Sequence, residues 1–150
     1  MPLDEVMRDT TALGGLAIYV VIAVIFFLLD NYRVFVELVV ALALLYGVIA
    51  IIRVLFFRKR PDSQKYSGFF TKIDAGSFPS MHSARSLVLA IILGTVFTQA
   101  TIRVLLAIVV LAVAYTRVRL RRHYVSDVVG GIVFGAIISW AAIKLAPFFV

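Results

Sequence analysis

The sequence predicts an all-α, polytopic integral membrane protein: a bundle of about five transmembrane helices forming a single domain over residues 1–150. Hydrophobic residues make up 63% of the chain and charged residues only 15%, whereas charged residues account for about 25% of ordinary soluble domains. The mean hydropathy is +1.05. Several apolar runs are long enough to cross a bilayer. They are continuous, which favours helices over the alternating strands of a membrane barrel.

The elements follow from where these apolar runs are interrupted. Residues 1–12 predict either a small helix at the membrane interface or a disordered tail. The expected spanning helices cover residues 13–29, 34–57, 80–98, 102–117 and 125–145. Short polar turns at 30–33 and 99–101 join neighbouring helices. The basic segments 58–79 and 118–124 form longer loops, and the first of these is broken by Pro61, Gly68, Gly76 and Pro79.

The crossing order brings the two basic loops together. An even number of crossings separates residues 58–79 from residues 118–124, so both loops lie on one side of the membrane. The only two histidines of the chain, His82 and His123, adjoin these loops. On the last helix, Gly131 and Gly135 form a GxxxG pair, which indicates close helix packing either within the chain or in a homodimer.

The charge and the cysteine content of the chain limit the ligands it can bind and the chemistry it can perform. The net charge is +7, and the Lys and Arg residues are clustered rather than spread. In a membrane protein this pattern favours an anionic lipid headgroup or the anionic bilayer surface over nucleic acid. The chain has no cysteine, which excludes disulfides and thiolate chemistry.

The segment Pro79–Ser80–Met81–His82 predicts an anion site at the start of a helix. Ser80 is suited to the N-cap position, and Pro79 stiffens the approach to it. The free N–H groups of the first turn then face the loop and can bind phosphate. Basic residues flank this segment in the sequence on both sides: Arg53, Arg58, Lys59 and Arg60 before it, and Arg117, Arg119, Arg121 and Arg122 after it.

Three blocks of sequence can now be compared with a known signature. They are Arg53 with six residues to Arg60–Pro61, then Pro79–Ser80–Met81–His82, and then Thr116–Arg117 with five residues to His123 and three to Asp127. In order and spacing they resemble the signature of the type 2 phosphatidic acid phosphatase superfamily, which also contains the vanadium haloperoxidases. The resemblance covers about residues 53–140. Arg53 replaces the usual Lys, Met81 the usual Gly and Thr116 the usual Ser.

The spacing of the residues agrees with the chemistry that the resemblance implies. His123 and Asp127 lie four residues apart, so a carboxylate can hold Nδ1–H of His123 and leave Nε2 as a nucleophile. His82 can act as a general acid. The resemblance implies a phosphohistidine on His123. Phosphate would be bound by Arg53, Arg60, Ser80, Met81 and Arg117. No metal or other cofactor is expected, because arginines neutralise the charge and the acidic residues lack metal-ligand spacing.

Several residues keep alternative interpretations. Arg85 lies at i+3 from His82 and either contacts a second phosphate or forms a structural pair. Arg119, Arg121 and Arg122 are either membrane anchors or contacts to the substrate, and Lys59 is a further candidate phosphate contact in the same basic loops. Asp127 has a simpler possible role as a cap of the last helix.

The expected function is a membrane lipid phosphatase that needs no metal, with a polyprenyl diphosphate such as undecaprenyl or dolichyl diphosphate as the favoured substrate. The alternatives are a phosphatidic acid or phosphatidylglycerophosphate phosphatase and, in another class, a silent lipid-binding or transport protein. A soluble haloperoxidase is excluded by the composition.

Orientation in the cell membrane is set by two opposing considerations. Lys and Arg predominate on the side of the two basic loops, which by the positive-inside rule is cytoplasmic. Most of these charges can also be explained by phosphate binding. The charges explained in this way are Arg58, Lys59, Arg60, Arg117, Arg119, Arg121 and Arg122. Without them, three charges remain on each side: Arg8, Lys65 and Lys72 on the side of the basic loops, and Arg33, Arg103 and Lys144 on the other. Members of the resembled family usually face outward, so we expect an extracytoplasmic site and a cytoplasmic C-terminus.

Overall fold

The computed structural model describes residues 3–62 and 67–150, and all regular structure within them is helical. Lys65 lies outside the described residues. The elements are α1 (Leu3–Ala12), α2 (Leu16–Leu28), α3 (Tyr32–Leu55), α4 (Phe69–Ala75), α5 (Met81–Val96), α6 (Ala100–Arg119), α7 (Val125–Leu145) and the short 3₁₀ helix η1 (Ala146–Phe148). Helices are therefore present at all five positions where spanning helices were expected, and their bounds agree with the sequence prediction to within about three residues.

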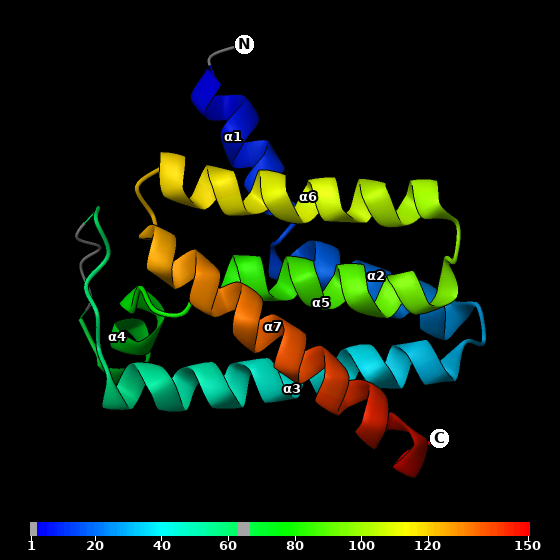
Figure 1. The fold of residues 1–150 in the computed structure, drawn as a ribbon. Helices are drawn as coiled ribbons and strands as arrows, with labels where there is room; N and C mark the ends of the chain where they lie inside the picture. Colours follow the sequence, from blue (N-terminus) through cyan, green and yellow to red (C-terminus); the bar gives the residue numbers. More distant parts are fainter. Residues whose placement is uncertain (1–2, 63–66) are drawn as a thin grey trace.

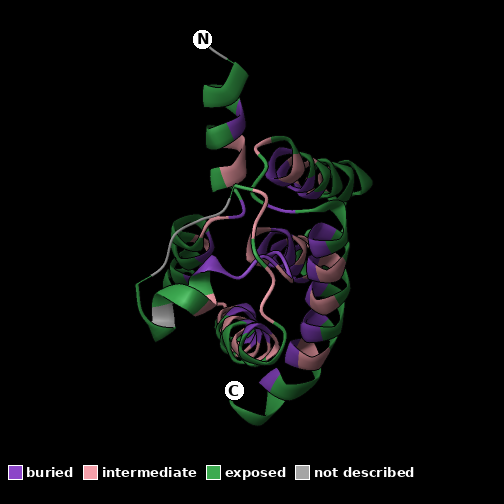
Figure 2. Cartoon of the chain, turned by 90° about the vertical axis from the view of Figure 1, so that its left-hand side faces the viewer, coloured by how far each residue is buried: buried purple, intermediate pink, exposed green. Residues whose placement is uncertain are grey.

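Helices α2, α3, α5, α6 and α7 form the bundle, with α5 at its centre (Figure 1). Seen along the bundle, the other four helices surround α5 and turn their exposed faces outward (Figure 2). The apolar core lies between α2, α3, α5 and α7, where Leu38, Leu45, Val88 and Ile92 are fully buried. The central position of α5 places its first turn, which carries His82, inside the protein.

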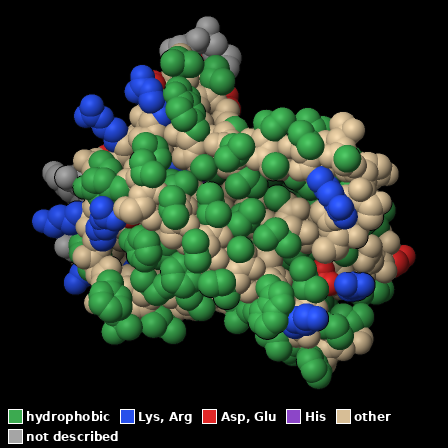
Figure 3. Space-filling view, viewed as in Figure 1, with side chains coloured by type: hydrophobic (Ala, Val, Ile, Leu, Met, Phe, Trp, Pro, Cys, Tyr) green, Lys and Arg blue, Asp and Glu red, His purple; other side chains and the backbone are tan. Residues whose placement is uncertain are grey.

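The outer surface of the bundle is apolar, as contact with lipid requires. Leu111, Trp140 and Ile137 are among many large hydrophobic side chains that are more than half exposed. Figure 3 shows hydrophobic side chains across the middle of one face, with Lys and Arg towards its two ends. Within the described residues, four helical segments are long and apolar enough to cross a membrane: 3–28, 32–55, 100–119 and 125–148.

Helix α5 is shorter than α3, α6 and α7. Its 16 residues extend about 24 Å at 1.5 Å per residue, less than the roughly 30 Å of a bilayer core. In Figure 1, α5 starts well inside the end of α3 on the side of the two basic loops. The shortfall therefore leaves space at that end of the bundle, beneath the loops.

The GxxxG pair is used inside the chain. A Cβ atom on Gly131 would lie 2.5 Å from the carbonyl oxygen of Ser80, and one on Gly135 would lie 2.9 Å from that of Ala84. Both contacts join α7 to α5. Two glycines thus let α7 approach the backbone of α5 at the turn that holds His82.

The N-terminal residues form a helix, the first of the two alternatives that the sequence left open. Helix α1 packs against α6 and projects away from the bundle on the side of the basic loops (Figure 1). Its Met7 is buried, whereas its charged side chains are exposed. The turn between α1 and α2 is tightly packed, because a Cβ atom on Gly14 would lie 2.7 Å from the carbonyl oxygen of His82.

Candidate active site

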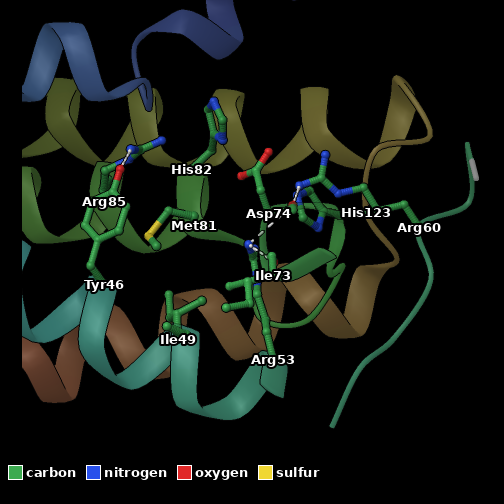
Figure 4. Close-up of a pocket in the computed structure, with 11 residues that line it drawn as sticks. Tyr46, Ile49, Arg53, Arg60, Ile73, Asp74, Met81, His82, Arg85 and His123 are labelled. Carbon is green, nitrogen blue, oxygen red and sulfur yellow. Dashed lines mark hydrogen bonds between the residues drawn. The ribbon is translucent and has the colours of Figure 1, made fainter. Parts of the chain in front are cut away.

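A cavity of about 370 Å³ lies at the start of α5, and both histidines line it. The walls come from α3, α4, α5 and the two basic loops (Figure 4). Its lining residues are Tyr46, Ile49, Ala50, Arg53, Arg60, Ile73, Asp74, Met81, His82, Arg85 and His123. Of the residues predicted for the site, the structure thus gathers His82, His123, Arg53, Arg60, Met81 and Arg85 around one space.

Ser80 forms the N-cap of α5, as predicted, and its side chain accepts a hydrogen bond from the N–H of Ser83. Ser80 is fully buried and is not among the residues that line the cavity. Its N–H donates to the carbonyl of Asp127 at 2.9 Å. This bond ties the start of α5, with Met81 and His82, directly to the first turn of α7.

His123 is buried in the loop before α7, and backbone contacts fix its position. Its N–H and that of Arg122 both donate to the carbonyl of Arg117, at 3.1 Å each. Arg121, with φ at 53°, makes the tight reversal that this arrangement needs. The ring Nδ1 lies 2.8 Å from the carbonyl oxygen of Ser77. A carbonyl only accepts hydrogen bonds, so Nδ1 carries the proton and Nε2 keeps its lone pair.

This geometry corrects one sequence-based expectation about Asp127. We expected its carboxylate to hold Nδ1–H of His123, but Oδ2 lies 3.7 Å from Nδ1, and the carbonyl of Ser77 takes that position instead. The reason is that His123 precedes α7 rather than sharing its first turn. The charge of Asp127 remains near the imidazole and would favour a positive ring.

Asp127 makes three other contacts, and one of them is the cap that the sequence left open. Oδ2 accepts from the N–H of Tyr124 at 2.8 Å, at the start of α7, and also from the hydroxyl of Ser77. Oδ1 pairs with Arg58 at 2.8 Å. The same Arg58 guanidinium lies 4.2 Å from the centre of the Tyr124 ring. Asp127 is thus a fully buried hub that joins the first basic loop to α7.

The surroundings of His123 keep its imidazole neutral. Burial is the main cause that lowers its pKa below the usual 6.5, and the nearby Arg117 and Arg60 lower it further. Asp127 opposes this shift but does not cancel it. An imidazole with a lowered pKa is unprotonated at neutral pH, which is the form that a nucleophile requires.

Arg53 and Arg60 line the cavity while their guanidinium groups hold the adjoining loop. Arg53 donates to the carbonyls of Ile73 at 3.1 Å and Pro79 at 3.0 Å. Arg60 donates to the carbonyl of Asp74 at 2.6 Å. Nε of Arg53 is buried without an acceptor among the described residues. These arginines therefore shape the end of α4 and still bring positive charge to the cavity.

Arg117 does not line the cavity of the histidines. Its side chain donates to the hydroxyl of Thr11 at 3.1 Å, while its Nε has no acceptor among the described residues. It faces a neighbouring cavity of about 480 Å³, which Arg8, Asp62 and Arg122 also line. Arg122 pairs with Asp62 at 2.7 Å. A polar space thus lies on the far side of Arg117, between α1 and the end of α6.

Lys59, Ser77 and Arg58 differ in how far the sequence indicated their positions. Lys59 is exposed and lines neither cavity, so among the described residues it has the position of a surface charge. No sequence pattern pointed to Ser77, whose carbonyl contacts His123 and whose hydroxyl contacts Asp127. Arg58 was visible only as one of a basic cluster, and its pairing with Asp127 depends on the folded loop.

Among the residues that the structure describes, no three His, Asp or Glu side chains gather in a way that could hold a metal ion. The positive groups around the cavity are arginines. The site can thus bind a phosphate group, present an imidazole nitrogen to phosphorus and supply a second imidazole for proton transfer.

Comparison with known proteins gives two kinds of similarity. The sequence of residues 34–149 matches the PAP2 superfamily. Among solved structures, LpxE from Aquifex aeolicus superposes with a TM-score of 0.79 at 20% identity, covering 96% of this chain and 87% of the other. A transmembrane PAP2-type phosphatidylglycerolphosphate phosphatase from Bacillus subtilis superposes with a TM-score of 0.67 at 24% identity, covering 100% and 80%.

Proposed function

The chain belongs to the PAP2 superfamily, and on that premise we propose that it is a membrane phosphatase that hydrolyses a lipid phosphate or diphosphate. One observation carries the proposal. His82 lies in the first turn of α5 and His123 in the loop before α7, yet they line one cavity together with Arg53 and Arg60. A lone buried histidine is commonly a packing residue, whereas two histidines around an arginine-lined space suit phosphoryl transfer.

The proposed reaction has two steps. In the first, Nε2 of His123 bonds to phosphorus while the bond from phosphorus to the leaving oxygen breaks, and His82 gives that oxygen a proton. In the second, water attacks phosphorus, His82 takes the proton of the water, and the P–N bond breaks to release phosphate. The charge on the oxygens is neutralised by arginines, so the reaction requires no metal. The carboxylate of Asp127 stabilises His123 while the ring is positive.

The favoured substrate is a polyprenyl diphosphate such as undecaprenyl or dolichyl diphosphate. The cavity is rich in arginine, and its α3 wall is formed partly by Tyr46, Ile49 and Ala50. Tyr46 lines the cavity and is 43% exposed, and a hydrocarbon chain would leave the cavity past this side chain. A glycerolipid phosphate is the second candidate, and the similarity to the Bacillus subtilis phosphatase favours it.

A substrate panel tests the proposal. Prenyl diphosphates, phosphatidic acid and phosphatidylglycerophosphate are each given to the detergent-solubilised protein, and phosphate release is measured. The H123A variant provides the background. We expect release from the prenyl diphosphates to be fastest and to persist in excess chelator. Binding of these lipids without release above the H123A background would instead indicate a silent lipid-binding protein.

We further propose that the site faces outward from the cell membrane. The basic loops lie at one end of the bundle and the C-terminus lies at the other (Figure 1). Ser67 and Val150 are both exposed, and the chain has no native cysteine. A cysteine at position 67 should react with an impermeant maleimide in intact cells, and one at position 150 only after lysis. The reverse labelling pattern would place the site in the cytoplasm.

A further inference from the structure

Arg85 is a buried positive charge in the same cavity, and it belongs to none of the three sequence blocks. Only 5% of it is exposed. Its Nε donates to the carbonyl of Gly14 at 3.0 Å, and one terminal nitrogen donates to the hydroxyl of Tyr46 at 3.2 Å. In Figure 4, Arg85 and Tyr46 lie at the opposite end of the cavity from His123 and Arg60.

The charge of Arg85 has no anionic partner in the described part of the protein. None of the ion pairs there includes it, and both of its hydrogen-bond acceptors are neutral groups. Asp74 lines the same cavity but is not within ion-pairing distance of Arg85. An unpaired charge inside a membrane protein is unfavourable unless a ligand or water compensates it. An anion bound in the cavity would supply that compensation.

The position of Arg85 relative to His82 indicates where such an anion would lie. Both residues are on α5, at i and i+3, and therefore on one face of the helix. Arg85 is about 4.5 Å farther along the helix axis, at 1.5 Å per residue. In the proposed reaction, His82 protonates the leaving oxygen while His123 attacks from the other side of phosphorus. Arg85 thus stands on the side of the leaving group.

We propose that Arg85 and Tyr46 form a second phosphate subsite, which binds the leaving phosphate of a lipid diphosphate. This inference rests on the proposed phosphatase function and specifies its substrate class. His123 attacks the terminal phosphorus, and the bond from that phosphorus to the bridging oxygen breaks. The electron pair stays on the bridging oxygen, which takes the proton of His82. The product that remains beside Arg85 is a lipid monophosphate, whose remaining negative charge the guanidinium neutralises.

The surroundings of Arg85 hold its guanidinium in place before substrate binds. The carbonyl of Gly14 fixes one edge, and Gly14 is packed so closely that an added Cβ would meet the carbonyl of His82 and the side chain of Val113. Tyr46 fixes a second nitrogen from α3. Its hydroxyl, which accepts from Arg85, can donate its own hydrogen to a phosphate oxygen. A pre-positioned donor of this kind favours one leaving group over another.

The test compares two substrates of one prenyl chain length, the diphosphate and the monophosphate. The wild-type protein should prefer the diphosphate. R85Q should lower kcat/KM for the diphosphate about 10- to 100-fold, the size of a lost charge-assisted hydrogen bond. It should lower kcat/KM for the monophosphate by less than about 3-fold, since that substrate has no second phosphate group for Arg85 to bind. R85K should restore part of the preference, and Y46F should shift it in the same direction as R85Q.

A matched control is R103Q. Arg103 is exposed on α6 and donates to the carbonyl of Gly94, far along the bundle from the histidines. The R103Q variant loses the same charge as R85Q and should leave the ratio of kcat/KM for the two substrates unchanged. An equal loss of kcat/KM for both substrates in R85Q and Y46F would overturn the proposed subsite and show that Arg85 has a structural role. So would a wild-type preference for the monophosphate. If R85Q does not fold, Y46F decides by the same ratio. Absence of release from either substrate by the wild-type protein would refute the phosphatase function itself.

Discussion

Replacing Gly131 with alanine should destabilise the bundle and slow the phosphatase. The added Cβ atom would lie 2.5 Å from the carbonyl oxygen of Ser80. That oxygen cannot turn away, because it accepts the first helical hydrogen bond of α5, from the N–H of Ala84 at 3.0 Å. The backbone of α5 must therefore shift relative to α7. The shift moves the turn that carries His82.

The magnitude can be set against a control glycine in the same bundle. Gly47 lies within α3, and a Cβ atom there would meet nothing within 4 Å. G47A should thus gain up to about 1 kcal/mol from helix propensity. In G131A the same gain is opposed by overpacking, which typically costs about 1–3 kcal/mol. We expect G131A to be about 1–3 kcal/mol less stable than G47A.

Thermal unfolding in detergent and phosphate release measure the two effects. G131A should unfold at a lower temperature than G47A and turn over more slowly, while G47A should keep wild-type activity. Equal stability and equal activity of the two variants would show that α5 and α7 are not packed as closely as we describe. The contact between Gly131 and Ser80 would then not be what positions His82.

The remaining predictions concern the chemistry of the site. H82A should lower kcat about 10²- to 10⁴-fold, the usual contribution of a general acid, and a smaller loss would remove His82 from that role. D127N should lower kcat about 10²-fold. This loss is smaller than in enzymes in which a carboxylate alone fixes the histidine tautomer, because the carbonyl of Ser77 holds Nδ1 of His123 here. A loss as large as that of H123A would contradict this explanation. The H82Q variant keeps His123 as its one histidine. NMR of the ring nitrogens should show the imidazolium of His123 becoming neutral below pH 6.5, as its lowered pKa requires. Titration above that pH would contradict the proposed surroundings.

The fold was predictable because its signals are local. Apolar runs, polar turns and the parity of crossings indicated five helices and the meeting of the two basic loops. Ser80 was recognisable as a cap from its position before an apolar run, and the structure confirms it. Helix α4 was not predicted, because its seven residues lie between Gly68 and Gly76 in a polar segment. So short a helix depends on the contacts that Arg53 and Arg60 make with its end.

The parts of the site that could not be predicted depend on tertiary contacts between loops. The spacing of His123 and Asp127 suggested a direct bond, yet the first loop brings the carbonyl of Ser77 to Nδ1 of His123 instead. Arg117 fits the sequence motif, but α1 supplies Thr11 as its partner and turns it towards another cavity. No pattern in one sequence shows where a backbone carbonyl or a separate N-terminal helix will lie.

The central claim is that His123 is the nucleophile, and trapping the phosphorylated protein tests it most directly. The H82A variant is mixed with a prenyl diphosphate that carries a radioactive terminal phosphate and is then quenched in alkali, in which phosphohistidine survives. Peptide mapping should locate the label on His123, the label should be released by acid, and the H82A/H123A double variant should carry none. Label on another residue, or substantial phosphate release by H123A alone, would contradict the account.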